Sequence, residues 1–323
     1  MAPVSATSSS SIFNKIGYWS PNTASVDWCE SNYEVSYYIA EFWNTISNLP
    51  SLLLVILGYH LFPTNDGRFK LLFWVCGTVA VGSALFHGTL RHKMQLLDEL
   101  PMLYSATIIL YILVETKHGR QGPWFPALLT VWISLTTFIF STASGKIQFY
   151  TFQSTYTILQ FCMIYYLRVL HVQQSAKHQS SISTANSNVT STSSNTYTSR
   201  QTKVNYSSYK QPSPSPSLRP QAMADVKILI RRALGFGALA VSIWLVDLRL
   251  CEFINGKGAQ SLLKWNPQLH AWWHVFSAVA MYHAALLVSF YHYDVLERSP
   301  AVYHWKGVVP AIRLGSKLKP RER

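Results

Sequence analysis

The amino-acid sequence predicts an all-α polytopic membrane protein, a bundle of seven transmembrane helices with a lumenal N-terminus and a cytosolic C-terminus. Three observations predict this fold: the composition, the apolar segments and the distribution of basic residues. The 323 residues are 49% hydrophobic and only 13% charged, whereas soluble domains carry about 25% charged residues. This composition excludes a disordered chain, and four cysteines are too few for a disulfide-stapled scaffold.

Seven apolar segments reach the length that a bilayer requires, which is about 20 residues. Turn residues such as Gly119 and Asn255-Gly256 lie in the connectors between them. Fewer spans combined with interfacial segments are the alternative. The expected spans are residues 37–61, 71–90, 97–115, 124–142, 149–170, 229–253 and 269–292.

The rest of the chain divides around these spans. Residues 1–36 form an N-terminal segment, residues 37–170 carry the first five helices and residues 227–293 the last two. Ser, Thr and Pro dominate residues 171–226, which we expect to be a disordered cytosolic loop. Residues 294–323 form a basic cytosolic tail.

The net charge of +13 could indicate nucleic-acid binding. The basic residues lie between apolar runs and in the tail, however, which is the pattern that membrane topology produces. Without the long connection between the fifth and sixth spans, eleven Lys and Arg residues fall on the C-terminal side and seven on the other. We therefore expect no nucleic-acid partner and a cytosolic C-terminus.

Three histidines are expected to meet at the lumenal side. His270 and His274 share one face of the seventh span because residues i and i+4 lie one turn apart. His87 ends the second span, and the alternation of spans brings it to the same side. Neutral imidazoles suit zinc, and three protein ligands leave a fourth position for water. A pair of interfacial histidines bonded to neighbours is the alternative for His270 and His274.

Ser83 and Asp98 lie near these histidines in the expected topology. Ser83 precedes His87 by one turn on the same face, and Asp98 opens the third span at the same side. A carboxylate beside a metal-bound water can hold it and accept its proton. The alternative for Asp98 is a charge near a helix N-terminus that the helix dipole favours.

A second polar group surrounds the start of the first span. Asp27, Glu30, Asn32 and Glu41 offer four side-chain oxygen ligands within fifteen residues, which suits a hard cation such as calcium. Glu41 is placed inside the apolar segment 37–61, where a carboxylate needs a partner. The spacing is not that of an EF-hand, and an ordinary polar lumenal loop is the alternative.

The cysteines divide between membrane and lumen. Cys76 and Cys162 lie within expected spans and should be free thiols. Cys29 and Cys251 both fall on the lumenal side, where disulfides persist, so we expect a bridge between them. Two unpaired thiols are the alternative.

The motifs together resemble the alkaline ceramidases, seven-span hydrolases of the endoplasmic reticulum and Golgi. The resemblance covers residues 17–293 except 171–226, and the Ser-rich insert and basic tail look like those of fungal members. The motifs that carry it are Gly17-Tyr-Trp-Ser-Pro21, Asp27-Trp-Cys-Glu30 with Asn32, Tyr38-Ile-Ala-Glu-Phe-Trp-Asn-Thr45, Ser83 to Leu90, Asp98-Glu-Leu-Pro-Met102 and His270-Ala-Trp-Trp-His274.

The resemblance implies residue roles and a reaction. It implies an endoplasmic reticulum or Golgi membrane protein that hydrolyses the amide of a ceramide-type lipid to a sphingoid base and a fatty acid. The implied roles are zinc binding by His87, His270 and His274, catalysis by Ser83 and Asp98, and calcium binding by Asp27, Glu30, Asn32, Glu41 and the carbonyl of Trp28.

The same residues are compatible with two other functions. A receptor similar to the progestin and adiponectin receptors would share the three histidines, the serine and the aspartate, with weak or latent ceramidase activity. The calcium-type segment favours the ceramidase. A transporter coupled to protons would explain Glu41 and Asp98 but leaves the three histidines without a reason.

Overall fold

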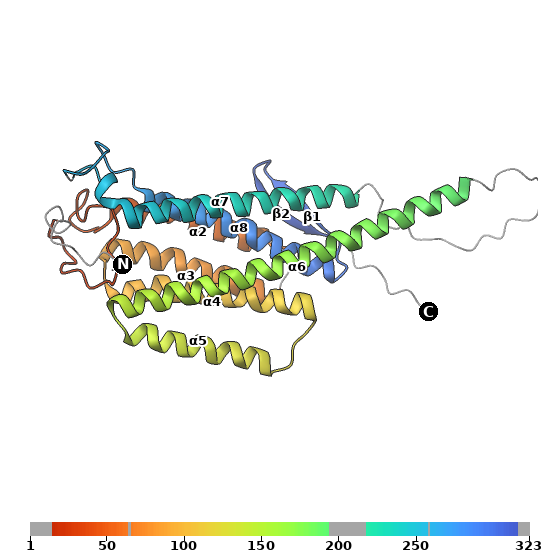
Figure 1. Ribbon diagram of the computed structural model, residues 1–323, viewed down its shortest axis with the longest axis horizontal. Helices are drawn as coiled ribbons and strands as arrows, with labels where there is room; N and C mark the ends of the chain where they lie inside the picture. The colour runs from red at the N-terminus through yellow and green to blue at the C-terminus, as the bar shows by residue number, and fades with distance from the viewer. Residues whose placement is uncertain (1–14, 64–65, 194–217, 258, 316–323) are drawn as a thin grey trace, which may run out of the picture.

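The computed structural model describes residues 15–63, 66–193, 218–257 and 259–315. These residues form a mainly helical bundle whose long helices run side by side (Figure 1). Each of the seven apolar segments contains helix, as the sequence predicted. The helices are α1 (Phe42–Ile46), α2 (Leu49–Leu61), α3 (Gly67–Thr89), α4 (His92–His118), α5 (Trp124–Thr142), α6 (Gly145–Ser193), α7 (Leu218–Ile254) and α8 (Leu269–Val295).

Five of the described helices are long and apolar enough to cross a membrane, which supports a multi-pass membrane protein. The segments that meet these criteria are Gly67–Thr89, His92–His118, Trp124–Thr142, Met223–Ile254 and Leu269–Val295. The expected first span, residues 37–61, and the expected fifth span, residues 149–170, are not among them.

The first expected span differs from the prediction because it is not one helix. Residues 37–41 are not helical, and the short helix α1 ends before α2 begins at Leu49. Pro50 stands in the first turn of α2; it has no N–H and its ring clashes with the carbonyl four residues earlier, so the chain cannot run on as one helix. Glu41 consequently occupies the N-cap position of α1 rather than lying inside a spanning helix.

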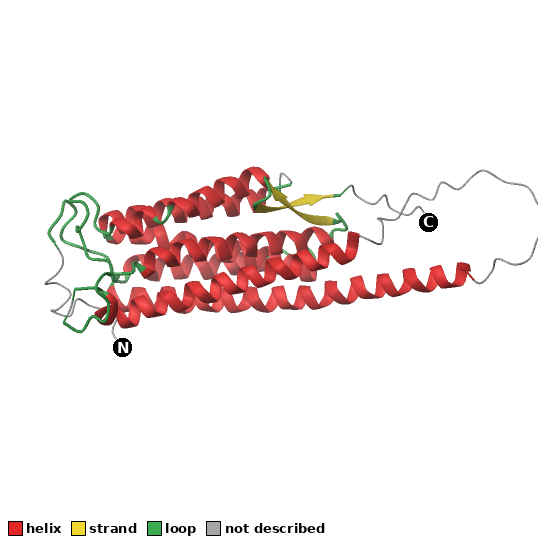
Figure 2. Ribbon diagram, turned by 90° about the horizontal axis from the view of Figure 1, so that it is seen from above, coloured by secondary structure: helices red, strands yellow, loops and turns green. Residues whose placement is uncertain are grey.

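The Ser/Thr-rich connection is more helical than its composition predicted. α6 continues to Ser193 and α7 begins at Leu218, so residues 171–193 and 218–226 are helical. No Gly or Pro interrupts the chain from Lys146 to Gln211, and His171 hydrogen-bonds the Tyr291 hydroxyl at 2.8 Å, which holds this part of α6 against α8. Residues 194–217 lie outside the described residues. Figure 2 shows α6 running beyond the other helices.

The fold is not purely α-helical, which corrects the predicted class. After α8 the chain forms an antiparallel hairpin of β1 (Pro300–Trp305) and β2 (Val309–Leu314). The Tyr282 hydroxyl of α8 donates a hydrogen bond to the Pro310 carbonyl at 2.8 Å, and Ile312 is buried in the core. These contacts fold part of the expected tail, residues 294–323, back onto the bundle (Figure 2).

Residues 15–36 and the described part of the α7–α8 connection lie at the same end of the bundle, opposite the hairpin (Figure 1). A disulfide joins Cys29 to Cys251 at the end of α7, with their Cα atoms 5.4 Å apart. Cys76 and Cys162 are free. The predicted pairing and the predicted free thiols are therefore confirmed.

The helices α3 and α4 approach closely at Gly82. A Cβ atom on Gly82 would lie 2.2 Å from the carbonyl oxygen of Leu97. Pro101, four residues later in α4, has no N–H, so it cannot donate the usual helical hydrogen bond to this carbonyl. The absence of a side chain at position 82 lets the two backbones meet at the end of the bundle where the histidines lie.

Candidate active site

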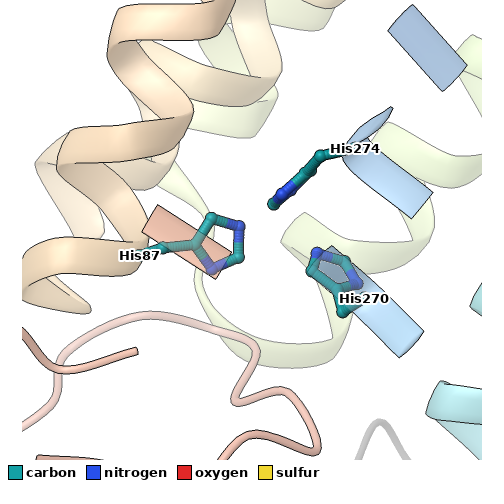
Figure 3. Close-up of side chains that lie close together, drawn as sticks. All are labelled: His87, His270 and His274. Atoms are coloured by element: carbon teal, nitrogen blue, oxygen red, sulfur yellow. The ribbon is translucent and has the colours of Figure 1, made fainter. Parts of the chain in front are cut away.

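His87, His270 and His274 converge in the folded chain. Each offers a ring nitrogen, and these three atoms lie within 4.8 Å of one another. The side chains are 1%, 2% and 4% exposed. Figure 3 shows His87 facing the two α8 histidines. Three buried imidazoles at this spacing can hold a metal ion, and the donor set is one that zinc prefers.

Two of the three histidines have a polar partner on the ring nitrogen Nδ1. The Glu41 carboxylate accepts a hydrogen bond from His87, and the Ser47 hydroxyl lies 2.7 Å from His274 Nδ1. Such a partner holds the ring and leaves the lone pair on Nε2 for a metal. The arrangement around these two histidines therefore fits a metal ligand better than an isolated interfacial pair.

Ser83 and Asp98 lie together beside His274. The Ser83 hydroxyl hydrogen-bonds the Asp98 carboxylate, and its Oγ lies 3.5 Å from His274 Nε2. Both side chains are buried. α4 begins at His92, more than one turn before Asp98, so the helix-dipole alternative has no support here. The predicted proximity of Ser83, Asp98 and a histidine is confirmed.

An apolar pocket opens at these residues. It contains about 950 Å³ of empty space, including its open mouth. Its lining runs along α8 from Trp273 to Ala285, about 18 Å at 1.5 Å per residue, comparable with half of the roughly 30 Å bilayer core. The polar groups Ser83, Asp98 and His274 border a wall that is otherwise mostly apolar.

The calcium-type residues lie close together but do not converge as the histidines do. Asn32 donates to the Asp27 carboxylate at 3.1 Å, and the Glu30 carboxylate accepts from the backbone N–H groups of Trp43 and Asn44 at 2.7 and 2.8 Å. Among the described residues, these carboxylates do not form a group within metal-binding distance.

Glu30 nevertheless lies in a strained electrostatic environment. Burial, with the nearby charge of Glu41 as a smaller cause, raises the pKa of Glu30 to about 8. A hard cation beside the Glu30 and Glu41 carboxylates would offset both the cost of burial and the repulsion between the two charges. The chemistry of the donor set thus fits calcium, although the side chains at present bond to one another and to the α1 backbone.

Trp28 connects the two groups. Its backbone N–H donates to Glu41 Oε1 at 3.2 Å, and its indole ring stacks on His270 with centroids 3.7 Å apart and an interplanar angle of 20°. Glu41 in turn contacts His87. The segment from Asp27 to Asn32, here called the calcium-type loop, and the histidine cluster therefore share direct contacts through Trp28 and Glu41.

Two supporting residues were not predicted. Ser47 gave no signal, because it lies in the expected first span with no motif of its own. Asp247 lies inside the expected span 229–253, where an acidic residue is costly and therefore informative. It is 2% exposed and accepts a hydrogen bond from the backbone N–H of Cys29 at 3.3 Å.

Comparisons with known proteins show which family the chain resembles. The family model for the ceramidases matches residues 20–313. The chain is 28% identical to alkaline ceramidase 3 of Mus musculus over 309 residues, covering 94% of this chain and 97% of that protein. It is 27% identical to an alkaline ceramidase of Arabidopsis thaliana, covering 92% and 95%. A shorter match of 106 residues is 45% identical to the alkaline ceramidase YPC1 of Saccharomyces cerevisiae and covers 32% and 34%.

Proposed function

Since the chain belongs to the ceramidase family, we propose that it is a zinc-dependent intramembrane amidase that hydrolyses a ceramide to a sphingoid base and a free fatty acid. One observation carries the proposal: three buried histidines meet beside a hydrogen-bonded serine–aspartate pair at an apolar pocket. The matched relatives are named ceramidases, so the receptor interpretation is not favoured.

The pocket fits a lipid amide. Its apolar wall suits a hydrocarbon chain, and its length matches about half of the bilayer core. The substrate amide would then lie at the polar end, against Ser83 and Asp98. Burial of both side chains excludes bulk water, which strengthens electrostatic interactions with the reacting atoms.

His87, His270 and His274 would hold the zinc ion, which when bound activates a water molecule and polarises the amide carbonyl. Asp98 takes the proton of the attacking water as the C–O bond forms. It then passes this proton to the amine as the C–N bond breaks. The Ser83 hydroxyl turns from Asp98 to donate to the oxygen on which negative charge develops. Glu41 and Ser47 keep their histidines oriented through Nδ1.

Calcium is proposed as a structural or regulatory ion. Asp27, Glu30, Asn32, Glu41 and the Trp28 carbonyl would hold it, and the ion would offset the burial and the nearby Glu41 charge that together raise the pKa of Glu30. Since Glu41 also contacts His87, calcium binding would hold Glu41 in place and so stabilise the orientation of His87 at the zinc site. The present contacts of these side chains would have to rearrange.

The proposed membrane arrangement keeps seven spans, with α1 and α2 together as the first and the N-terminal half of α6 as the fifth. The N-terminus would be lumenal and the C-terminus cytosolic, in the endoplasmic reticulum or Golgi membrane. Support comes from the Lys and Arg distribution and from the disulfide, which forms in an oxidising compartment, at the end of the bundle that carries the histidines.

Purified chain assayed for released sphingoid base and bound zinc tests the proposal. His87→Ala, His270→Ala and His274→Ala should each abolish activity and lower bound zinc. Ser83→Ala should lower kcat about 10²- to 10³-fold and Asp98→Ala about 10²- to 10⁴-fold, with zinc largely retained.

A matched control is His283→Asn, which changes another buried α8 histidine outside the cluster. It should keep zinc and activity. Full activity in any of the three histidine variants, or wild-type protein that releases no sphingoid base and binds no zinc, would contradict the proposed function.

A further inference from the structure

Asp247 is a buried carboxylate that the proposed reaction leaves without a role. It lies in the last part of α7 and is 2% exposed. A carboxylate taken out of water is costly unless hydrogen bonds compensate. It accepts the backbone N–H of Cys29 at 3.3 Å and also a hydrogen bond from the backbone N–H of His270. One side chain therefore joins α7, the calcium-type loop and the start of α8.

The start of α8 needs an acceptor from elsewhere in the chain. The cap residue Gln268 has φ +54° and makes no side-chain capping hydrogen bond. The first N–H groups of a helix have no partner within that helix, and His270 is the second residue of α8. The Asp247 carboxylate supplies this acceptor, and negative charge at a helix N-terminus is favourable.

His270 also differs from the other two histidines in how its ring is held. Its buried Nδ1 has no hydrogen-bond partner among the described residues, whereas Nδ1 of His87 and of His274 each has one. Its ring is instead stacked on Trp28. Trp273 of the same helix also stacks on it, with centroids 5.0 Å apart. The position of His270 thus depends on its backbone and on these two stacked rings, of which only Trp28 comes from outside α8.

Asp247 holds the backbone beside both rings of the Trp28–His270 stack. Its carboxylate accepts a hydrogen bond from the N–H of Cys29, the residue after Trp28, and another from the N–H of His270 itself. The disulfide to Cys251 and the hydrogen bond from Asn266 Nδ2 to the Cys29 carbonyl, at 2.7 Å, also attach this loop. Removing Asp247 would therefore leave the loop tethered while freeing the backbone of His270.

We propose that Asp247 is a positioning residue of the zinc site, which sets the position of His270 by holding the backbones of both His270 and the Trp28–Cys29 segment. The inference rests on the proposed function, because it assumes that His270 binds zinc. It gives His270 the outer support that Glu41 and Ser47 give to the other two histidines. Outer partners of this kind are worth about 10- to 100-fold in metal affinity.

The test compares zinc affinity, measured by competition with a chelator, in full-length variants. Asp247→Leu removes the acceptor while keeping the branched four-atom shape of the side chain, and it should weaken zinc binding about 10- to 100-fold. Asp247→Glu keeps the charge but displaces the carboxylate, so it should also bind zinc more weakly than the wild-type protein. This variant replaces Asp247→Leu in the test if the Leu variant does not fold. Asp247→Asn keeps an acceptor oxygen in place and should bind zinc more tightly than Asp247→Leu.

The control is the double variant Cys29→Ser/Cys251→Ser, which removes the covalent tether between the same segments. It should keep wild-type zinc affinity and an unchanged visible spectrum after Co²⁺ replaces zinc, whereas the spectrum of Asp247→Leu should change because the ligand geometry changes. Wild-type affinity in folded Leu or Glu variants, an Asn variant no tighter than Leu, or an equal loss in the cysteine variant would overturn the inference. Wild-type protein without zinc would instead overturn the proposed function.

Discussion

Replacing Gly82 by alanine should damage catalysis more than it damages the fold. The added Cβ would lie 2.2 Å from the Leu97 carbonyl oxygen and 2.6 Å from its carbonyl carbon. Cβ atoms essentially never come within 3.0 Å of a heavy atom of another chain segment. The helices α3 and α4 must therefore separate by about 0.8 Å, the difference between 3.0 and 2.2 Å. The obstacle is backbone, so no side-chain rotation can relieve it.

The displacement falls directly on the reacting groups. Ser83 follows Gly82 in α3, and Asp98 follows Leu97 in α4, so the Ser83–Asp98 hydrogen bond joins the residues that are pushed apart. A misplacement of about 1 Å can cost about 10²-fold in rate. Overpacking costs about 1–3 kcal/mol, while alanine gains about 1 kcal/mol over glycine in a helix. The net loss of stability is therefore small, and we expect kcat/KM to fall about 10²-fold.

The assay measures kcat/KM from the initial rate of sphingoid base release, beside the melting temperature. Gly77→Ala is the matched control on the same helix, because its Cβ would meet Val55 Cγ1 at 3.5 Å, an ordinary contact. The control should keep wild-type kcat/KM. If Gly82→Ala kept it too, the close approach of α3 and α4 would not be what places Ser83 and Asp98.

The remaining predictions concern calcium, the disulfide and topology. Added calcium should raise the melting temperature of the wild-type protein, because a ligand bound only by the folded state stabilises it; a shift of equal size in Glu41→Ala would count against the site. Alkylation without reductant should label neither Cys29 nor Cys251, and mass spectrometry that finds both labelled would exclude the bridge. The sequons at Asn188 and Asn205 should carry no glycan if the α6–α7 connection is cytosolic; a glycan on either, detected by a mobility shift after glycosidase treatment, would reverse the orientation.

The sequence alone determined the apolar segments that contain helix and the end of the bundle at which the candidate residues gather. Apolar runs of spanning length predict helices without knowledge of their packing, and the alternation of spans brings His87 and His270 to one end. The same reasoning placed Cys29 opposite Cys251, which the disulfide confirms. The break at Pro50 was readable from the sequence, since proline cannot continue a helix, whereas the hairpin after α8 gave no clear alternation.

Only the tertiary structure decided how the site is held. Ser47 and His274 are separated by 227 residues and Cys29 and Asp247 by 218, yet each pair is in hydrogen-bond contact. Helical periodicity gives the face on which a side chain lies, but not which residue of a neighbouring helix it meets. That choice depends on how far each helix slides and rotates against the next, and side-chain packing and close approaches such as Gly82 against Leu97 determine it.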